Sequence, residues 1–272
     1  MMNKRAFMMA AGAGSAAAAM GLMSPVASAT GTVAKKRRTY VLIHGAWHGG
    51  WCWKYVAESL RKNGHRVYTP SLTGLAEHSH LLSPAITLTT HITDVVNLFR
   101  WEDIEDAVLV AHSYGGWPVS GALEQIGDRV RSVVFVDAFR PENGQRVMDT
   151  NSAQFQQALK AALARGEAGR PVPDAGIFGI LKPENRAWVQ SKMTPQPAGV
   201  AVEPIKLTGA VEHVASKTYV RATGYSQPHF DRYFANAKAD PTWRAIGMDP
   251  KESGHDVMID APDKLANILE HV

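Results

Sequence analysis

The chain has 272 residues, of which 45% are hydrophobic and 20% are charged, so it can bury one substantial core. Its formal net charge is +4 at pH 7, and its Lys and Arg residues are scattered, which argues against a nucleic-acid partner. The single cysteine, Cys52, cannot form an intramolecular disulfide. The composition therefore indicates one globular domain that folds without a disulfide framework.

The N-terminal residues have the layout of a signal peptide. A short basic start, Met1–Arg5, precedes an apolar stretch, Ala6–Met23, and Ala27-Ser28-Ala29 matches a signal-peptidase site. A membrane anchor is the competing interpretation, but the apolar stretch is dominated by Ala and Gly and is followed by the cleavage motif. We therefore predict a signal peptide at 1–29, no stable membrane anchor, and export of residues 30–272 to a bacterial periplasm or the medium.

Beyond this leader, short apolar runs alternate with helical patterns. Strands are predicted at Thr39–Ile43, Arg66–Thr69, Ala107–Ala111, Arg131–Asp137, Thr218–Ala222 and Trp243–Gly247. Helices are predicted at Trp53–Asn63, Thr90–Trp101, Gly116–Ile126, Pro228–Lys238 and Pro262–His271. This alternation predicts an α/β fold with about six mostly parallel strands and helices on both faces of the sheet.

The first predicted strand leads into a glycine-rich loop, His44–Trp51. Glycines leave room for backbone N–H groups to converge on a developing negative charge. The expected donors are the N–H groups of Ala46 and of Tyr114, which follows a candidate nucleophile. His44 and His48 could be metal ligands, but no carboxylate or cysteine lies at ligand spacing, so we expect structural roles and no metal.

The third predicted strand leads directly into a serine framed by small residues, His112-Ser113-Tyr114-Gly115-Gly116. A sharp strand-to-helix turn lifts a serine hydroxyl clear of the sheet edge, and small neighbours prevent collisions there. The pattern is A-x-S-x-G, with Ala111 at the usual first glycine. An ordinary helix-start serine needs no such framing, so Ser113 is the candidate nucleophile.

A histidine near the C-terminus supplies a candidate base. Gly254-His255-Asp256 lies in a loop just before the last predicted helix, Pro262–His271. A histidine in such a loop can reach over a serine and accept its proton. An exposed loop histidine is the alternative, but the order serine, acid, histidine favours His255 as the base.

Together these motifs resemble the α/β-hydrolase superfamily, in the branch of plant methylesterases and hydroxynitrile lyases with their bacterial esterase relatives. The resemblance rests on His44–Trp51, Ala111–Gly116, Gly254–Asp256 and the loop Leu72–Ser79. It covers the chain from about Tyr40 to its end. It implies the α/β-hydrolase fold and a triad containing Ser113 and His255, and no motif for a metal or nucleotide cofactor accompanies it.

The triad acid departs from the pattern of the plant relatives. Their acid follows the next-to-last strand, at about Tyr225 here, where no carboxylate stands. Asp137 ends the strand after Ser113, 24 residues further on, at the same edge of a parallel sheet. Some lipases and dehalogenases resembling this fold take their acid from that strand, so we predict Asp137 as the acid. Asp231, within a predicted helix, and Asp256, adjoining the histidine, are weaker candidates.

From about Pro141 to Leu207 the alternation breaks, and we expect a cap inserted over the active site at 141–207. The segment holds a polar helical piece, Asn151–Arg165, and a stretch rich in Gly and Pro. Side chains expected to line an apolar substrate site are Trp47, Phe139, Phe178 and Trp188, together with Phe155 and Met193. Each of them could equally pack in the core of the cap.

These residues favour a serine hydrolase that cleaves small, apolar carboxylic esters through an acyl-enzyme. A non-catalytic small-molecule binder of the same fold is an alternative, because Tyr225 stands at the expected acid position. A hydroxynitrile lyase is disfavoured, because lyases resembling this branch carry a threonine at Gly45 and a lysine in place of Asp256. The expected partner is a small ester, and the oligomeric state is left open.

Overall fold

The computed structural model describes residues 37–272, so the expected signal peptide at 1–29 lies outside the described residues. Export of the mature chain therefore stays a prediction. Within residues 37–272, no helix combines the length and the apolar character needed to cross a membrane.

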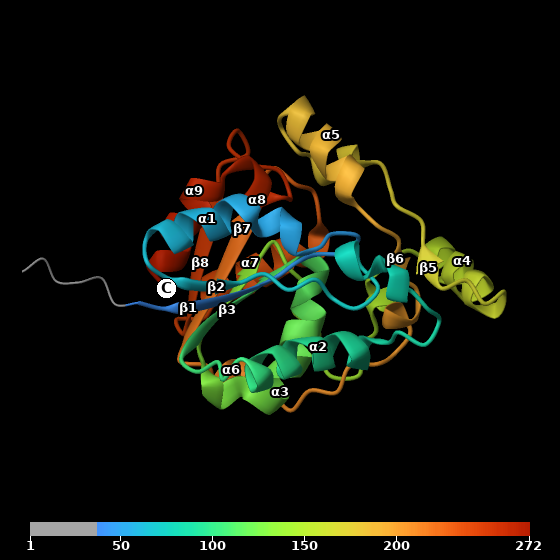
Figure 1. The fold of residues 1–272 in the computed structure, drawn as a ribbon, viewed down its shortest axis with the longest axis horizontal. Coiled ribbons are helices and arrows are strands. Elements are labelled where there is room, and N and C mark those ends of the chain that lie inside the picture. Colours follow the sequence, from blue (N-terminus) through green and yellow to red (C-terminus); the bar gives the residue numbers. More distant parts are fainter. Residues whose placement is uncertain (1–36) are drawn as a thin grey trace, which may run out of the picture. The chain divides into compact units, whose positions relative to one another are not determined.

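The central sheet has six strands, all parallel, in the order β2-β1-β3-β4-β7-β8 (Figure 1). Their bounds are β1 Thr39–Ile43, β2 Arg66–Tyr68, β3 Ala107–His112, β4 Val130–Val136, β7 Ser216–Ala222 and β8 Trp243–Met248. Inner strands of a parallel sheet are buried on both faces and are therefore apolar along their length, as β3 is. The prediction of six parallel strands is confirmed.

Alternate residues along each strand supply two hydrophobic cores, one on each face of the sheet. Val41, Ile43 and Leu109 belong to the first core, whereas Leu42 and Val110 belong to the second. Helices α2 Leu88–Trp101, α3 Gly116–Ile126 and α7 Pro228–Ala239 contribute to the first core, and α1 Lys54–Lys62, α8 Val257–Asp260 and α9 Pro262–Glu270 to the second. In Figure 1, α1, α8 and α9 lie above the sheet and α2 and α3 below it, so the prediction of helices on both faces is confirmed.

The chain between β4 and β7 leaves the sheet and forms the cap segment. It contains α4 Ala153–Ala164, β5 Gly169–Arg170, α5 Pro183–Lys192, β6 Gln196–Pro197 and α6 Ala210–His213. The two short strands pair antiparallel, with Arg170 opposite Gln196. The polar helical piece corresponds to α4, but α5 and the small sheet were not predicted. Pro183 stands at the start of α5, where its missing N–H needs no partner, so this proline does not interrupt the helix.

The register of the sheet brings the ends of neighbouring strands together. His112 of β3 is aligned with Val136 of β4, and Val136 with Val220 of β7. The residues that follow the first two, Ser113 and Asp137, therefore lie side by side at the carboxyl edge of the sheet. In open α/β sheets this is the edge where ligands bind.

Candidate active site

Ser113 occupies a sharp turn between β3 and α3. Its φ is 51°, in the left-handed region that favours glycine, and the residue is partly exposed. The next chain segment has no room for side chains. A Cβ on Gly115 would lie 2.7 Å from the carbonyl oxygen of His44, and one on Gly116 would lie 1.9 Å from that of Phe139. The small residues after Ser113 are therefore required by close packing around the turn.

The two expected oxyanion donors border the cavity that contains Ser113. Tyr114 belongs to the short helical turn Ser113–Gly115, and the first N–H groups of a helix have no partner within it. The Tyr114 side chain is buried, and its hydroxyl lies 2.9 Å from Nδ1 of His91, which holds the residue in place. Ala46, in the loop after β1, borders the same cavity.

The loop that carries Ala46 is fastened to the cap through its neighbour. Trp47 has a φ of 64°, and its N–H donates to Oε1 of Gln196 at 2.9 Å. Its indole N–H donates to the carbonyl oxygen of Pro171 at 3.0 Å, and its own carbonyl accepts from Thr194 at 3.0 Å. The cap therefore holds the backbone of this loop in its strained conformation.

His255 and Asp137 come together from positions 118 residues apart in the sequence. Nδ1 of His255 lies 2.6 Å from Oδ2 of Asp137, and both side chains are buried. Asp137 directly follows β4, and its Oδ1 accepts a hydrogen bond from the N–H of Ala222 at 3.0 Å. Because Nδ1 is engaged by the carboxylate, Nε2 is the imidazole nitrogen that remains for proton transfer.

Arg221, in β7, is a residue of the site that sequence reasoning missed. Its Nη1 donates to Oδ1 of Asp137 at 2.6 Å, and its Nε and Nη2 donate to Oδ1 of Asp231 at 3.0 and 2.8 Å. The Arg221 side chain is 2% exposed, so the negative charge of Asp137 is balanced inside the protein. The signal in the sequence was an arginine within the otherwise apolar run Thr218–Ala222.

Tyr225, at the position where the plant relatives carry their acid, packs against the imidazole. Its ring is stacked on that of His255, with centroids 4.4 Å apart. The rings of Phe230 and Phe178 also stack with the imidazole, at 5.6 and 5.9 Å. The aromatic rings fix the plane of His255, while Asp137 fixes its rotation within that plane.

A second buried ion pair, between His48 and Asp256, adjoins His255. Nε2 of His48 lies 3.2 Å from Oδ2 of Asp256, and its Nδ1 donates to the carbonyl oxygen of Ala46 at 2.8 Å. Burial alone would raise the pKa of Asp256, but the charge and hydrogen bond of His48, together with the neighbouring His112 and His255, outweigh burial and lower that pKa to about 2. Burial lowers the pKa of His48, but the charge and hydrogen bond of Asp256, together with the hydrogen bond to Ala46, outweigh burial, so this pKa is raised. Asp256 therefore pairs with His48, whereas the imidazole of His255 pairs with Asp137.

Two further buried histidines near the site, His44 and His112, are neutral. Nε2 of His44 accepts a hydrogen bond from the N–H of Leu72 at 3.0 Å, and burial lowers the pKa of His44 to about 3. Burial also lowers the pKa of His112, whose Nε2 donates to the carbonyl oxygen of His255 at 3.2 Å. His112, His255 and Asp256 offer ligand atoms within 4.8 Å of one another. Each side chain makes one of the hydrogen bonds described above, although Nδ1 of His112 and Oδ1 of Asp256 have no hydrogen-bond partner among the described residues. The donor set fits a hydrogen-bonded cluster better than a metal site.

The cavity beside Ser113 has a volume of about 170 Å³. Three of the six predicted substrate residues, Trp47, Phe139 and Phe178, line it together with His255. The lining residues that sequence reasoning did not place there are Val147, Thr150, Asn151, Arg170, Ile177, Tyr225, Gln227 and Phe230.

Trp188 does not line this cavity. It is carried by α5 and contacts Trp51 and Tyr55, with ring centroids 5.2 and 5.8 Å apart. Phe155 lines a neighbouring groove of the cap, and Met193 is buried in the second core. The aromatic composition of the cap indicated apolar packing, but which rings face Ser113 depends on where each cap helix lies.

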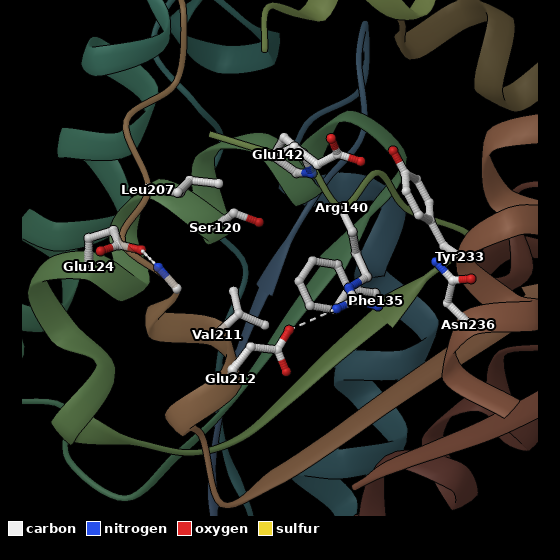
Figure 2. A pocket seen from close by; sticks show the side chains of 12 residues that line it. Ser120, Glu124, Phe135, Arg140, Glu142, Leu207, Val211, Glu212, Tyr233 and Asn236 are labelled. Carbon is white, nitrogen blue, oxygen red and sulfur yellow. Dashed lines mark hydrogen bonds and ion pairs between the residues drawn. The ribbon is translucent and has the colours of Figure 1, made fainter. Parts of the chain in front are cut away.

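A different pocket, of about 250 Å³, lies between α3, α7 and the chain around residues 207–212 (Figure 2). Three of its four charged side chains are bonded to one another or to the backbone. Arg140 pairs with Glu212 at 3.1 Å, and Glu124 accepts hydrogen bonds from the N–H groups of Gly209 and Ala210. Ser113, Asp137 and His255 are not among its lining residues, so we place the candidate active site in the smaller cavity.

Comparisons with known proteins identify the family of this chain. The model of the alpha/beta hydrolase family matches residues 40–268. A carbendazim hydrolyzing esterase of Nocardioides sp. (strain SG-4G) is 39% identical over 241 residues, which are 85% of this chain and 97% of that protein. Methyl jasmonate esterase 1 of Vitis vinifera is 34% identical over 165 residues, 59% of this chain and 62% of that protein.

A solved structure extends the likeness to three dimensions. It is an extracellular alpha/beta-hydrolase from a Paenibacillus species that shares structural and functional homology with tobacco salicylic acid binding protein 2. The two chains superpose with a TM-score of 0.70 and 25% identity, over 85% of this chain and 97% of the other. The chain described here therefore belongs to the alpha/beta hydrolase family, and it groups with the esterases of that family.

Proposed function

We propose that this protein is a serine esterase that hydrolyses small carboxylic esters through an acyl-enzyme. Ser113 is the nucleophile, His255 the general base and acid, and Asp137 the residue that orients His255. The observation that carries the proposal is the 2.6 Å contact between His255 Nδ1 and Asp137 Oδ2, beside a cavity that is lined by both His255 and Ser113.

In the first half-reaction, His255 accepts the proton of the Ser113 hydroxyl as the oxygen attacks the ester carbonyl. The N–H groups of Ala46 and Tyr114 stabilise the negative charge that develops on the carbonyl oxygen. Collapse of the intermediate breaks the carbon–oxygen bond, and His255 returns the proton to the departing alcohol. The acyl group remains on Ser113.

In the second half-reaction, His255 accepts a proton from water, which attacks the acyl-enzyme. The acid is released and the proton returns to Ser113, so one ester and one water give one acid and one alcohol. Throughout, the carboxylate of Asp137 holds the imidazole in one tautomer and stabilises its positive charge.

The size of the cavity and the relatives both favour small substrates. A volume of about 170 Å³ is below the ~300–1,000 Å³ of pockets that bind drug-sized ligands. The relatives named above are esterases, one of which hydrolyses carbendazim and one methyl jasmonate. An ester with a small alcohol group is therefore the substrate class that we propose.

Two other functions are less well supported by the geometry. A lyase of the kind discussed above carries threonine in place of Gly45, but a Cβ at Gly45 would lie 2.8 Å from Nδ1 of His112 and 3.0 Å from the Cβ of Ser113. A non-catalytic binder was suggested by Tyr225 at the usual acid position. Asp137 supplies a carboxylate to His255 from the neighbouring strand, which removes that argument.

The test is covalent labelling of the purified protein with a fluorophosphonate, read by mass spectrometry, alongside turnover of p-nitrophenyl acetate and butyrate. We expect one adduct on Ser113, and loss of both adduct and turnover in Ser113→Ala. Ser120→Ala, a buried serine of α3, is the matched control and should keep both. A Ser113→Ala variant that retains most of its turnover would contradict the proposal.

A further inference from the structure

Arg170, in β5 of the cap, borders the catalytic cavity, and its side chain has no hydrogen-bond or ion-pair partner in the described part of the chain. Its guanidinium carbon lies 4.9 Å from the centroid of the Trp47 ring and 5.5 Å from that of Phe155. Its Nε is fully buried and has no hydrogen-bond partner within residues 37–272. The side chain lines both the catalytic cavity and the adjoining groove of the cap.

The flanking aromatic rings do not satisfy this side chain. A cation–π contact engages the face of a guanidinium, whereas its N–H donors point outward in the plane and need acceptors. Burial lowers the pKa of Arg170 to about 10, so the group still carries its positive charge at neutral pH. An unpaired charge in such surroundings is unfavourable until an acceptor arrives.

A second unpaired donor stands directly across the small sheet. Gln196 is the cross-strand partner of Arg170, and residues opposite each other in an antiparallel pair project from the same face. Oε1 of Gln196 is engaged by the N–H of Trp47, but its Nε2 is buried without a partner among the described residues. One face of the small sheet thus carries two N–H donors without acceptors among the described residues, the guanidinium Nε of Arg170 and the amide Nε2 of Gln196.

Among the described residues, the cavity that Arg170 lines provides no anion for its guanidinium. Of its lining residues in the described part of the chain, none is Asp or Glu, and Arg170 is the one with a permanent charge. The pocket of Figure 2 differs, since its arginine is already paired with a glutamate. The missing acceptor in the catalytic cavity is therefore expected to come with the ligand.

We propose that Arg170 is the binding site for a carboxylate carried by the ester substrate, so that the preferred substrates are half-esters of small dicarboxylic acids or acyl esters of small hydroxy acids. This assignment rests on the proposed esterase function. Hydrolysis proceeds as described above, while the free carboxylate remains ionised and bound to the guanidinium. The charged group orients the ester and replaces the water lost from Arg170.

Matched pairs of substrates test this assignment. Monomethyl esters of the dicarboxylic acids from malonate to adipate are each compared with the corresponding primary amide, which has the same shape without the charge. Acetoxyacetate is compared with acetoxyacetamide, so that a carboxylate on the acyl side is distinguished from one on the alcohol side. The measured quantity is the ratio of kcat/KM for the acid to that for the amide at pH 7.5.

We expect the wild-type ratio to exceed about 10 for at least one pair, and Arg170→Gln to lower it about 10- to 100-fold, as for loss of a hydrogen bond to a charged group. Arg165→Gln is the matched control and should keep the wild-type ratio, because Arg165 borders only the outer groove and pairs with Glu167. Arg170→Lys retains the charge without the planar donors and should give an intermediate ratio.

A wild-type ratio of one or less for every pair, or an unchanged ratio in Arg170→Gln, would overturn the assignment. If Arg170→Gln does not fold, the wild-type ratios and Arg170→Lys still decide the question. Failure of the esterase proposal is recognised separately, since Ser113 would then remain unlabelled by the fluorophosphonate. A labelled Ser113 without a carboxylate preference would reject the role of Arg170 alone.

Discussion

Arg221 and Arg170 are two arginines near the active site that carry the same charge but differ in their hydrogen-bond partners. Arg221, in the central sheet, donates to Asp137, to Asp231 and to backbone carbonyl oxygens. Arg170, in the small sheet of the cap, has aromatic rings on its faces and a buried Nε for which residues 37–272 provide no acceptor. The first arginine completes an internal network, whereas the second lines the cavity with a donor that lacks an acceptor among the described residues.

This difference indicates that the charge of Arg221 stabilises the fold and that the charge of Arg170 binds a ligand. Removing one member of a buried pair leaves an uncompensated charge behind, at a cost of about 3–5 kcal/mol. A buried arginine without a hydrogen-bond acceptor destabilises the folded state through the cost of its desolvation. Removing such an arginine therefore raises the free energy of unfolding. Such a group is retained where binding satisfies it. The same kind of substitution should therefore have opposite effects at the two positions.

The largest expected effect comes from removing the shared carboxylate. Asp137→Asn keeps the shape of the side chain but presents the wrong group to Nδ1 of His255, and it should lower kcat about 10⁴-fold. The measurement is steady-state turnover of p-nitrophenyl butyrate. Asp231→Asn is the matched control, because it removes the other carboxylate bonded to Arg221, which is 64% exposed and does not contact His255. Turnover within about tenfold of wild type in Asp137→Asn would mean that the acid lies elsewhere.

Arg221→Met should have the next largest effect, on stability. It leaves the carboxylate of Asp137 buried without its strongest partner, and the free energy of unfolding should fall by about 3–5 kcal/mol. Urea unfolding at pH 7 measures the change, and Arg221→Lys, which keeps the charge, should recover part of it. A decrease below about 1 kcal/mol would show that the pair of Arg221 and Asp137 contributes little to stability. Arg221 and Arg170 would then not differ in their effect on the fold.

The Arg221 network could not be predicted from the sequence, although both acids that it contacts were considered. The apolar runs before Ser113 and Asp137 are strong signals because buried parallel strands are apolar along their whole length. The position of Arg221 beside Asp137 depends instead on β4 pairing with β7, where Val136 is aligned with Val220. Two strands separated by the whole cap cannot be recognised as neighbours from their composition.

The cap illustrates a second limit. Its aromatic residues were visible in the sequence, but Phe178 stacks with His255 while Trp188 lies with Trp51, outside the cavity. Short elements such as β5 and β6 have only two residues each, too few to give a periodic pattern. For that reason Arg170 could not be identified as a residue of the cavity before the small sheet was seen.

The smallest expected effect, and the one that completes the contrast, is on the stability of Arg170→Met. Methionine fills similar space between Trp47 and Phe155 and needs no acceptor, so relief of desolvation should exceed the lost cation–π contacts, which are worth about 0.5–1 kcal/mol each at exposed sites. We expect the free energy of unfolding to rise by about 1 kcal/mol in urea at pH 7, while Arg165→Met stays within about 0.5 kcal/mol of wild type. A clear decrease in the free energy of unfolding of Arg170→Met would instead show that Arg170 stabilises the cap. If Arg170 is retained for binding, replacing it should raise the free energy of unfolding and abolish the carboxylate preference together. The reason is that a buried charge without its ligand destabilises the folded protein.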